Sequence, residues 1–171
     1  MRSRMIAGLI LVLFSEVACA QTGQVAKAQL HNATGEAVGS ATFTETPEGV
    51  AIALSVYNLP PGKHGFHLHT VGKCEPPDFK SAGAHFNPYG KKHGLKNPEG
   101  AHAGDLQNLE VGVDGTAKVE AVAKGVTLSP GAHSLFQPDG TAVVIHANPD
   151  DEMTDPAGNA GPRIACGVIT Q

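Results

Sequence analysis

Three features are missing from the sequence, and each absence excludes a class of protein. There is no basic block, and 16 acidic residues outnumber 12 lysines and arginines, which argues against a nucleic-acid partner. The apolar run from Met5 to Phe14 has ten residues, whereas a bilayer needs about 20, so no membrane span is predicted. Helical periodicity is weak nearly everywhere, which argues against a helical fold.

The first 20 residues have the order of a secretory signal. Arg2 and Arg4 precede the apolar run, and Ala18-Cys19-Ala20 fits an A-x-A cleavage site with cutting before Gln21. The sequence therefore predicts a signal peptide at 1–20 and one domain at 21–171, exported to the periplasm or the extracellular space. Without the leader the formal net charge goes from −4 to −5, because two arginines and one glutamate are removed.

A second interpretation of the leader is a bacterial lipoprotein signal with Cys19 as the lipidated residue. Glu16 stands where such signals usually carry leucine, so the cleaved secretory signal is the preferred prediction.

Cysteine is scarce. Cleavage would leave two, Cys74 and Cys166, and an even number in an exported protein predicts one disulfide between them. It would close a loop of over ninety residues. Two buried free thiols are the alternative.

Glycine and proline divide the rest of the chain into short segments: 20 glycines and all 12 prolines follow the leader. Between them, apolar and polar residues alternate as in strands. The segments with this pattern are 24–31, 37–46, 49–59, 65–69, 116–123, 141–147 and 163–170. Seven or eight short strands with no helix between them predict an antiparallel sandwich or barrel.

Two long segments, about 70–110 and 147–162, lack clear periodicity. Loops of this length inside a compact domain are usually functional or disordered. The first is rich in metal-ligand residues, which favours the functional interpretation.

Histidine is the residue that this chain has in excess, with 9 in 171. His67 and His69 are two apart on a predicted strand, so their side chains leave the same face. His85, His93, His102 and Asp105 follow in the long segment. Three imidazoles and one carboxylate form a set that suits tetrahedral Zn²⁺.

His146 interrupts the apolar segment 141–147. Taken alone it is a core histidine, and it matters only if the fold brings it beside His67 and His69.

Six separated motifs, "GFHLH", "SAGAHFNP", "KKHG", "AHAGDL", "VVIH" and "GNAGPRIACGVI", together resemble the copper/zinc superoxide dismutase family of the bacterial exported type. The resemblance runs from about residue 65 to 170. It implies a flattened eight-stranded antiparallel Greek-key barrel with two long functional loops. It also implies one copper and one zinc per chain, and dismutation of superoxide to oxygen and hydrogen peroxide in defence of the cell envelope.

The resemblance assigns a role to each site residue. The implied copper ligands are His67, His69, His85 and His146. The implied zinc ligands are His85, His93, His102 and Asp105. His85 would thus bridge both ions as an imidazolate and carry a proton, and Arg163 would attract and hold superoxide. Cys74 and Cys166 would be the disulfide. Asp150 would join His67 and His93 from outside the two sites, with Asp151 as the alternative.

The chain departs from the better-known animal members of the family in segment 147–162, which is shorter here and has four acids and no lysine. We therefore expect superoxide to be steered by Arg163 with lysines of the other long segment, namely Lys73, Lys80, Lys91 or Lys92.

Three points stay open at the level of sequence. His31, His64 and His133 have no matching partner and receive no functional role. An exported copper- or zinc-binding or buffering protein on the same fold is the alternative function. A homodimer could use the face carrying Val50 to Val56 or the face carrying Val111 to Val119, and the sequence does not choose between them.

Overall fold

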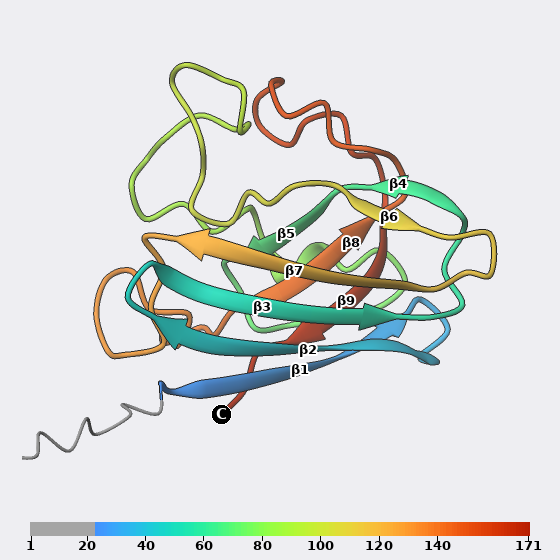
Figure 1. Ribbon diagram of the computed structural model, residues 1–171, viewed down its shortest axis with the longest axis horizontal. Coiled ribbons are helices and arrows are strands. Elements are labelled where there is room, and N and C mark those ends of the chain that lie inside the picture. Colours follow the sequence, from blue (N-terminus) through green and yellow to red (C-terminus); the bar gives the residue numbers. More distant parts are fainter. Residues whose placement is uncertain (1–22) are drawn as a thin grey trace, which may run out of the picture.

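The computed structural model of the chain describes residues 23–171, so the predicted signal peptide and Cys19 lie outside the described residues. Nine β-strands and one 3-10 helix occur in this range (Figure 1). The strands are β1 (Val25–Asn32), β2 (Ala37–Thr46), β3 (Gly49–Val56), β4 (Gly62–His64), β5 (Phe66–His69), β6 (Leu109–Val111), β7 (Ala117–Lys124), β8 (Ala142–His146) and β9 (Arg163–Val168), and the helix η1 is Lys80–Ala82. Among residues 23–171, no helix is long and apolar enough to cross a membrane.

Seven strands form one curled antiparallel sheet in the order β5-β8-β9-β1-β2-β3-β7, and β4 pairs with β6 in a second, two-stranded sheet. Figure 1 shows the large sheet curling round so that β5 and β8 lie behind β3 and β7. The predicted antiparallel all-β fold is confirmed. Each of the seven predicted segments contains one strand of the large sheet, and the two short strands β4 and β6 bring the described total to nine instead of eight.

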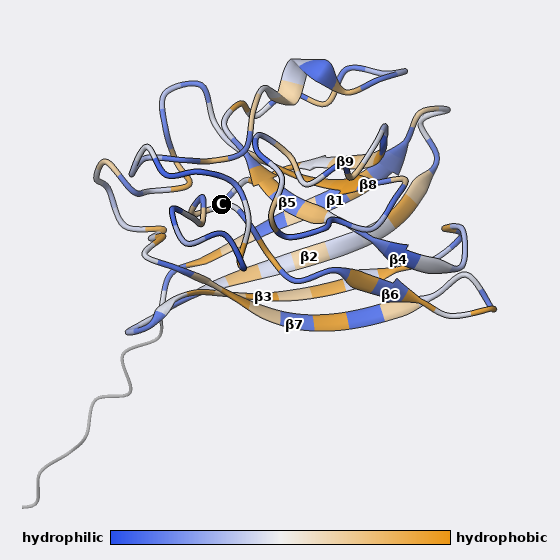
Figure 2. Cartoon of the chain, turned by 90° about the horizontal axis from the view of Figure 1, so that it is seen from above, coloured by the Kyte–Doolittle hydropathy of each residue, from blue (hydrophilic) through white to orange (hydrophobic). Residues whose placement is uncertain are grey.

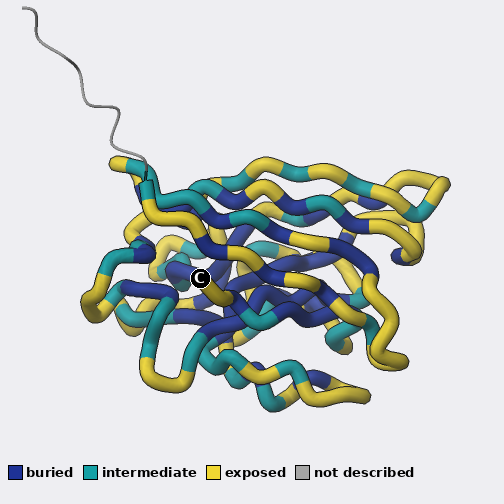
Figure 3. The backbone as a smooth tube through the Cα atoms, turned by 90° about the horizontal axis from the view of Figure 1, so that it is seen from below, coloured by how far each residue is buried: buried dark blue, intermediate teal, exposed yellow. Residues whose placement is uncertain are grey.

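Alternation of side chains explains the strands on the open side of the sheet. Along β7, Lys118 and Glu120 face solvent while Val119 and Ala121 pack against the core, and Figure 2 shows the resulting alternating bands. The same period in β1 to β3 buries one face of each strand. Burial is accordingly concentrated in the middle of the barrel, with exposed backbone in the outer turns (Figure 3).

Strands β5 and β8 differ because both of their faces are buried. Phe66 and Leu68 of β5 point into the main core. His67 and His69 leave the opposite face and are also fully buried. That second face is covered by the two long connections, which we call the long loop (residues 70–108) and the acidic loop (residues 147–162). The sequence therefore places a buried polar face directly behind the hydrophobic core.

A disulfide fixes the start of the long loop. Cys74 and Cys166 are bonded, with their Cα atoms 5.6 Å apart, so the predicted pairing is present. Cys166 lies in β9, and it is buried in a small apolar cluster with Phe79 and Ala82 of the loop. The disulfide and this cluster hold residues 70–84 against the barrel.

The long loop and the acidic loop lie side by side beyond one edge of the barrel, where Figure 1 draws them in green and red-orange. Backbone hydrogen bonds join them: the Lys96 N–H donates to the Glu152 carbonyl at 2.9 Å. Residues that are more than 50 positions apart in the chain thus form one cover over β5 and β8.

Candidate metal centre

Four buried histidines converge on the covered face. His67 and His69 come from β5, His146 from the end of β8, and His85 from the long loop. One ring nitrogen of each lies within 4.8 Å of one nitrogen of every other. The fold thus brings His146 beside His67 and His69, which was the condition for giving it a role.

Backbone pairing carries the long loop to this position. The Leu68 N–H donates to the Gly104 carbonyl at 2.9 Å, and the Leu68 carbonyl accepts from the Phe86 N–H at 2.8 Å. A Cβ at position 104 would overlap the Leu68 carbonyl, so only glycine permits this approach. His85 and Asp105, the neighbours of these loop residues, are thereby set next to β5.

Each of these four histidines has one nitrogen that is buried without a hydrogen-bond partner. These atoms are His67 Nδ1, His69 Nε2, His85 Nε2 and His146 Nε2. Within residues 23–171, no other buried side-chain nitrogen or oxygen lacks a hydrogen-bond partner. Leaving a buried polar atom unsatisfied is costly, so four in one place need an explanation. A metal ion bound by all four nitrogens supplies it, and imidazole is a ligand that suits copper.

The other nitrogen of three of these rings is fixed by an acceptor. His69 Nδ1 donates to the Gly83 carbonyl at 3.0 Å, and His146 Nδ1 donates to the Gly161 carbonyl at 3.1 Å. His67 Nε2 lies 2.7 Å from Asp150 Oδ2. Since a neutral imidazole carries one N–H, these contacts leave the lone pair on the unpartnered nitrogen, which is the atom a metal needs.

Burial keeps three of these rings, those of His69, His85 and His146, uncharged at neutral pH. It lowers the pKa of His85 to about 4, helped by the neighbouring His67 and against the opposing effect of Asp105. It also lowers the pKa of His146 to about 3 and that of His69 well below its ordinary value. Neutral rings have a lone pair available for a metal ion, because metal ligation requires the deprotonated nitrogen.

A second group adjoins the first and consists of His85, His93, His102 and Asp105. Asp105 Oδ1 lies 2.9, 3.1 and 3.2 Å from the Nδ1 atoms of these three histidines, in sequence order. In a tetrahedral zinc site with bonds of 2.0–2.1 Å, ligand atoms are about 3.3–3.4 Å apart, so the set has close to the required spacing. The other carboxylate oxygen of Asp105, Oδ2, accepts hydrogen bonds from the backbone N–H groups of Gly94 and His102.

The charge of Asp105 is well stabilised in this position. Burial opposes ionisation, but hydrogen bonds from His102, His85 and His93 outweigh it and hold the pKa of Asp105 far below its usual range. The reciprocal effect appears at His93: burial works against its charged form, yet hydrogen bonds with Asp105 and Asp150 raise the pKa of His93 to about 9. An ionised carboxylate among imidazoles is the charge pattern that suits a divalent cation.

His85 belongs to both groups. Its Nδ1 faces Asp105, whereas its Nε2 is the unpartnered atom on the side of the four histidines. Its ring centroid lies 4.1 Å from that of His67 and 5.1 Å from that of His93. One imidazole therefore presents a nitrogen to each group.

Asp150 connects the two groups from behind. Its carboxylate contacts His67 Nε2 at 2.7 Å and His93 Nε2 at 3.0 Å. Asn108 holds its backbone on both sides, donating to the Asp150 carbonyl at 2.8 Å and accepting its N–H at 2.7 Å. Asp151, the alternative considered from the sequence, instead accepts the Met153 N–H within the acidic loop.

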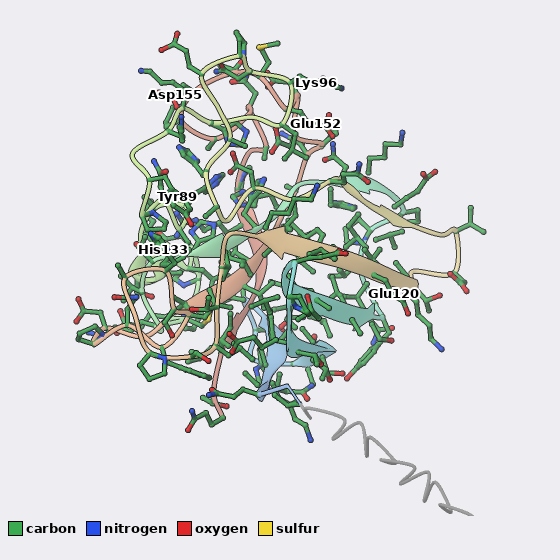
Figure 4. All side chains as sticks on the ribbon, turned by 60° about the vertical axis from the view of Figure 1, so that its left-hand side comes forward. Tyr89, Lys96, Glu120, His133, Glu152 and Asp155 are labelled. Carbon is green, nitrogen blue, oxygen red and sulfur yellow. A yellow bond between two sulfur atoms is a disulfide. The ribbon has the colours of Figure 1, made fainter. Side chains whose placement is uncertain are left out.

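Some supporting residues were not predicted. Asn108 is a common polar residue without a metal-ligand side chain, so no sequence signal marked it. His64 was given no role, yet it is buried, with Nδ1 2.8 Å from the His146 carbonyl and Nε2 2.8 Å from the Pro60 carbonyl. His64 therefore has main-chain partners and belongs to neither ligand group. His133 also has a contact, with Nδ1 3.1 Å from the Tyr89 hydroxyl (Figure 4).

Arg163 begins β9 opposite His146. Its Nη1 and Nη2 donate to the Phe79 and Gly83 carbonyls, each at 2.6 Å, and it is half-buried. Burial lowers the pKa of Arg163, but a guanidinium starts so high that the group stays charged. Since Gly83 also accepts from His69, the cation is tied to the group of four histidines.

Fold and site together define an antiparallel β-barrel protein with two adjoining metal-ligand groups that share one histidine. Residues 37–169 match the family model for copper/zinc superoxide dismutase (SODC). The chain is 55% identical over 146 residues to the Cu-Zn superoxide dismutase 2 of Aquifex aeolicus (strain VF5), which covers 84% of this chain and 85% of that protein. The chain belongs to the copper/zinc superoxide dismutase family.

Other relatives and solved structures agree with this assignment. Superoxide dismutase-like protein YojM of Bacillus subtilis (strain 168) is 46% identical over 144 residues, which are 82% of this chain and 74% of that one. The crystal structure of a SOD-like protein from Bacillus subtilis superposes with a TM-score of 0.80 at 44% identity, covering 83% of this chain and 96% of that chain. The Cu/Zn superoxide dismutase from Brucella abortus gives 0.70 at 28% identity, covering 86% and 100%.

Proposed function

We propose that the protein dismutes superoxide, converting 2 O₂⁻ and 2 H⁺ to O₂ and H₂O₂. The observation that carries the proposal is the set of four unpartnered histidine nitrogens, which converge beside a fixed arginine. Copper, when bound, supplies one-electron transfer in both directions, because imidazole ligands tolerate both Cu(I) and Cu(II).

The two ligand groups divide the metals between them. His67, His69, His85 and His146 would hold copper, since all four offer an imidazole nitrogen and none a carboxylate. The group that contains Asp105 would hold zinc, since its three imidazoles and one carboxylate suit a closed tetrahedral site. Asp150 would orient one histidine of each group from behind.

His85 is the residue to which we assign the proton. The reaction consumes two protons for each peroxide, and His85 Nε2 faces the copper group without another partner. Because one lone pair cannot bind copper and a proton together, this nitrogen would hold the proton when it is not bound to copper, and from there the proton could be passed to the product. Asp105, on the far side of the ring, keeps the imidazole in place.

Arg163 would bind the substrate anion. Two of its N–H groups are committed to loop carbonyls, which fixes the guanidinium beside the copper group. A fixed cation attracts O₂⁻ and can hold it by charge-assisted hydrogen bonds.

We expect Arg163→Leu to lower kcat/KM for superoxide by about tenfold to a hundredfold, the range in which steering charges act. Arg163→Lys keeps the positive charge but not the paired N–H donors of the guanidinium, so its kcat/KM should lie between those of Arg163→Leu and the wild type. Stopped-flow decay of superoxide measures both, with copper and zinc content determined in parallel. Wild-type kcat/KM in a fully metallated Arg163→Leu protein would refute the role.

The lysines that could assist Arg163 differ in their surroundings. Lys73 is exposed, whereas Lys80 is paired with Asp78 at 2.8 Å and Lys92 with Asp155 at 3.5 Å. The neighbouring carboxylates offset part of the long-range field of Lys80 and Lys92, so removing either lysine leaves a net negative charge at its position.

Changing Lys73 and Lys80 together to glutamine should lower kcat/KM and flatten its dependence on ionic strength, because salt screens steering by charges. The matched control is the same change at Lys27 and Lys118, exposed lysines of β1 and β7 that alter the net charge equally. An unchanged salt profile in the loop variant, or an equal change in the control, would contradict steering from the long loop.

The alternative is a binding or buffering protein for copper or zinc on the same fold. Both ligand groups and Arg163 are complete in this chain, which favours the enzyme. The deciding experiment is metal analysis of the purified protein with a superoxide-decay assay. One copper and one zinc per chain with cyanide-sensitive activity would support dismutation, and zinc alone without activity would favour the binding protein.

We also propose that the protein works outside the cytoplasm. The Cys74–Cys166 disulfide supports this, since such bonds persist in oxidising compartments. Immunoblotting of periplasmic and membrane fractions would separate a cleaved soluble form from one lipidated at Cys19.

A further inference from the structure

All four acids of the acidic loop have partners within the protein. Asp150 contacts two histidines of the metal centre, and Asp151 accepts backbone N–H groups of its own loop. Glu152 and Asp155 instead reach across to the long loop, and Figure 4 shows Glu152 beside Lys96 and Asp155 on the opposite side of the same loops. The four acidic residues of this loop therefore have structural roles. The sequence showed only that the loop is acidic and has no lysine, and did not indicate these contacts.

The contact of Asp155 is made directly with a residue of the proposed zinc group. Asp155 Oδ1 accepts the His93 backbone N–H at 2.7 Å. The same carboxylate lies 3.5 Å from Lys92 Nζ, and its Oδ1 lies 4.0 Å from His102 Nε2. One side chain of the acidic loop thus hydrogen-bonds to one histidine of that group and lies near the ring of a second.

The Asp155–His93 hydrogen bond is the first tie between the two loops, and a second tie joins Lys96 to Glu152. Lys96 Nζ is 2.8 Å from Glu152 Oε2, and the Lys96 N–H donates to the Glu152 carbonyl at 2.9 Å. Gly94 sits between these ties, and a Cβ there would collide with the Glu152 backbone. The segment from Lys92 to Lys96 is therefore clasped at both ends.

The hydrogen bond at His93 matters because it ties the backbone of that residue to the acidic loop, whereas the other backbone contact, from the Asn97 amide to the His93 carbonyl at 2.9 Å, stays within the long loop. The two ring nitrogens of His93 contact Asp105 and Asp150. A backbone anchor at the same residue fixes the Cα as well, so that the ring cannot swing with the exposed loop around it. Groups that orient a metal ligand from outside usually change metal affinity by about 10- to 100-fold when they are removed.

We propose that Asp155 is a positioning residue for the zinc group, and that the acidic loop acts through it as a clamp on the long loop. The inference rests on the proposed zinc ligands His93 and His102. It assigns Asp155 no contact with substrate, so its effect is exerted through the geometry of those two histidines.

Zinc affinity is the measurement that tests the clamp, by competition with a chromophoric chelator on the full-length protein. Asp155→Ala removes both the acceptor and the charge, and should weaken zinc binding about 10-fold or more. Asp155→Asn keeps an oxygen for the His93 N–H and should stay within about fivefold of the wild type, because an exposed ion pair contributes little. The absorption bands of Co²⁺ in place of zinc should shift in Asp155→Ala and return in Asp155→Asn.

The control is Asp114→Ala in the turn before β7, where Asp114 accepts the Thr116 N–H at 3.0 Å and belongs to neither ligand group. It removes a comparable exposed aspartate and should leave zinc affinity and the cobalt spectrum unchanged.

In the second tie, Lys96→Glu should weaken zinc binding, and adding Glu152→Lys should restore it. Wild-type zinc affinity and cobalt spectrum in Asp155→Ala would overturn the clamp.

Failure of the proposed zinc group gives a different result. If the wild-type protein itself binds neither zinc nor cobalt, the ligand assignment is wrong and the clamp is overturned with it. If the wild type binds zinc tightly and every clamp variant does the same, only the role of Asp155 is overturned.

Discussion

His146→Ala should abolish copper binding and superoxide dismutation while zinc binding remains. The substitution removes one of the four unpartnered nitrogens, and it leaves the second group, with Asp105 at its centre, intact. The β8 backbone is also retained, because the residue 146 N–H donates to the Gly65 carbonyl irrespective of the side chain. A loss confined to copper would separate the functions of the two groups.

Metal analysis, electron paramagnetic resonance of bound copper and superoxide decay would be measured on the same preparation. His31→Ala is the matched control, since His31 is an exposed histidine of β1 outside both ligand groups. It should keep both metals and full activity. Retention of stoichiometric copper and of wild-type turnover in His146→Ala would refute the proposed copper group.

Removal of the disulfide by Cys74→Ser with Cys166→Ser should lower the free energy of unfolding by about 4–5 kcal/mol, because the bond closes a loop of 92 residues. It should also reduce activity. The tethered segment carries the Phe79 and Gly83 carbonyls that hold the guanidinium of Arg163, and a released segment would leave it without fixed acceptors.

Urea unfolding followed by circular dichroism measures the stability, with metals removed by chelator from the variant and the wild type alike. The wild type in a strong reductant should lose a similar amount and serves as the control for the effect of the serines. A loss below about 1 kcal/mol would contradict the expectation from loop closure.

The large sheet was predictable because its strands alternate between a buried and an exposed face. Every predicted segment contains a strand, including the one around β5, whose alternation of Phe66 and Leu68 with His67 and His69 separates core from site. Strands β4 and β6 were missed because three residues are too few to show a period.

The histidines and the aspartate of the two groups were predicted from residue type and from the family resemblance, and the fold brings them together. Apart from Asp150, the residues that hold them in place were not predicted. Asn108 and Asp155 act through ordinary polar side chains, and Gly83 acts through its carbonyl, which any residue possesses. Such partners are chosen by the approach of distant segments, and a single sequence carries no signal for that approach.

His64 shows the limit in another way. Histidine is a residue type that draws attention in the sequence. The partners of His64, however, are two backbone carbonyls, that of Pro60 and that of His146, which is 82 positions further along the chain. A histidine that contacts main chain has no partner residue that a motif could reveal.

The double burial of β5 has a consequence for how the site can change. Phe66 and Leu68 anchor one face of the strand in the core, so a slip of one residue would send both into the metal centre and carry His67 and His69 into the barrel. The hydrophobic core thus acts as a register lock for two of the proposed copper ligands. Substitutions in the two loops can therefore change the charge around the site and the access of substrate to it. The spacing of His67 and His69, in contrast, is fixed by the packing of Phe66 and Leu68 in the core.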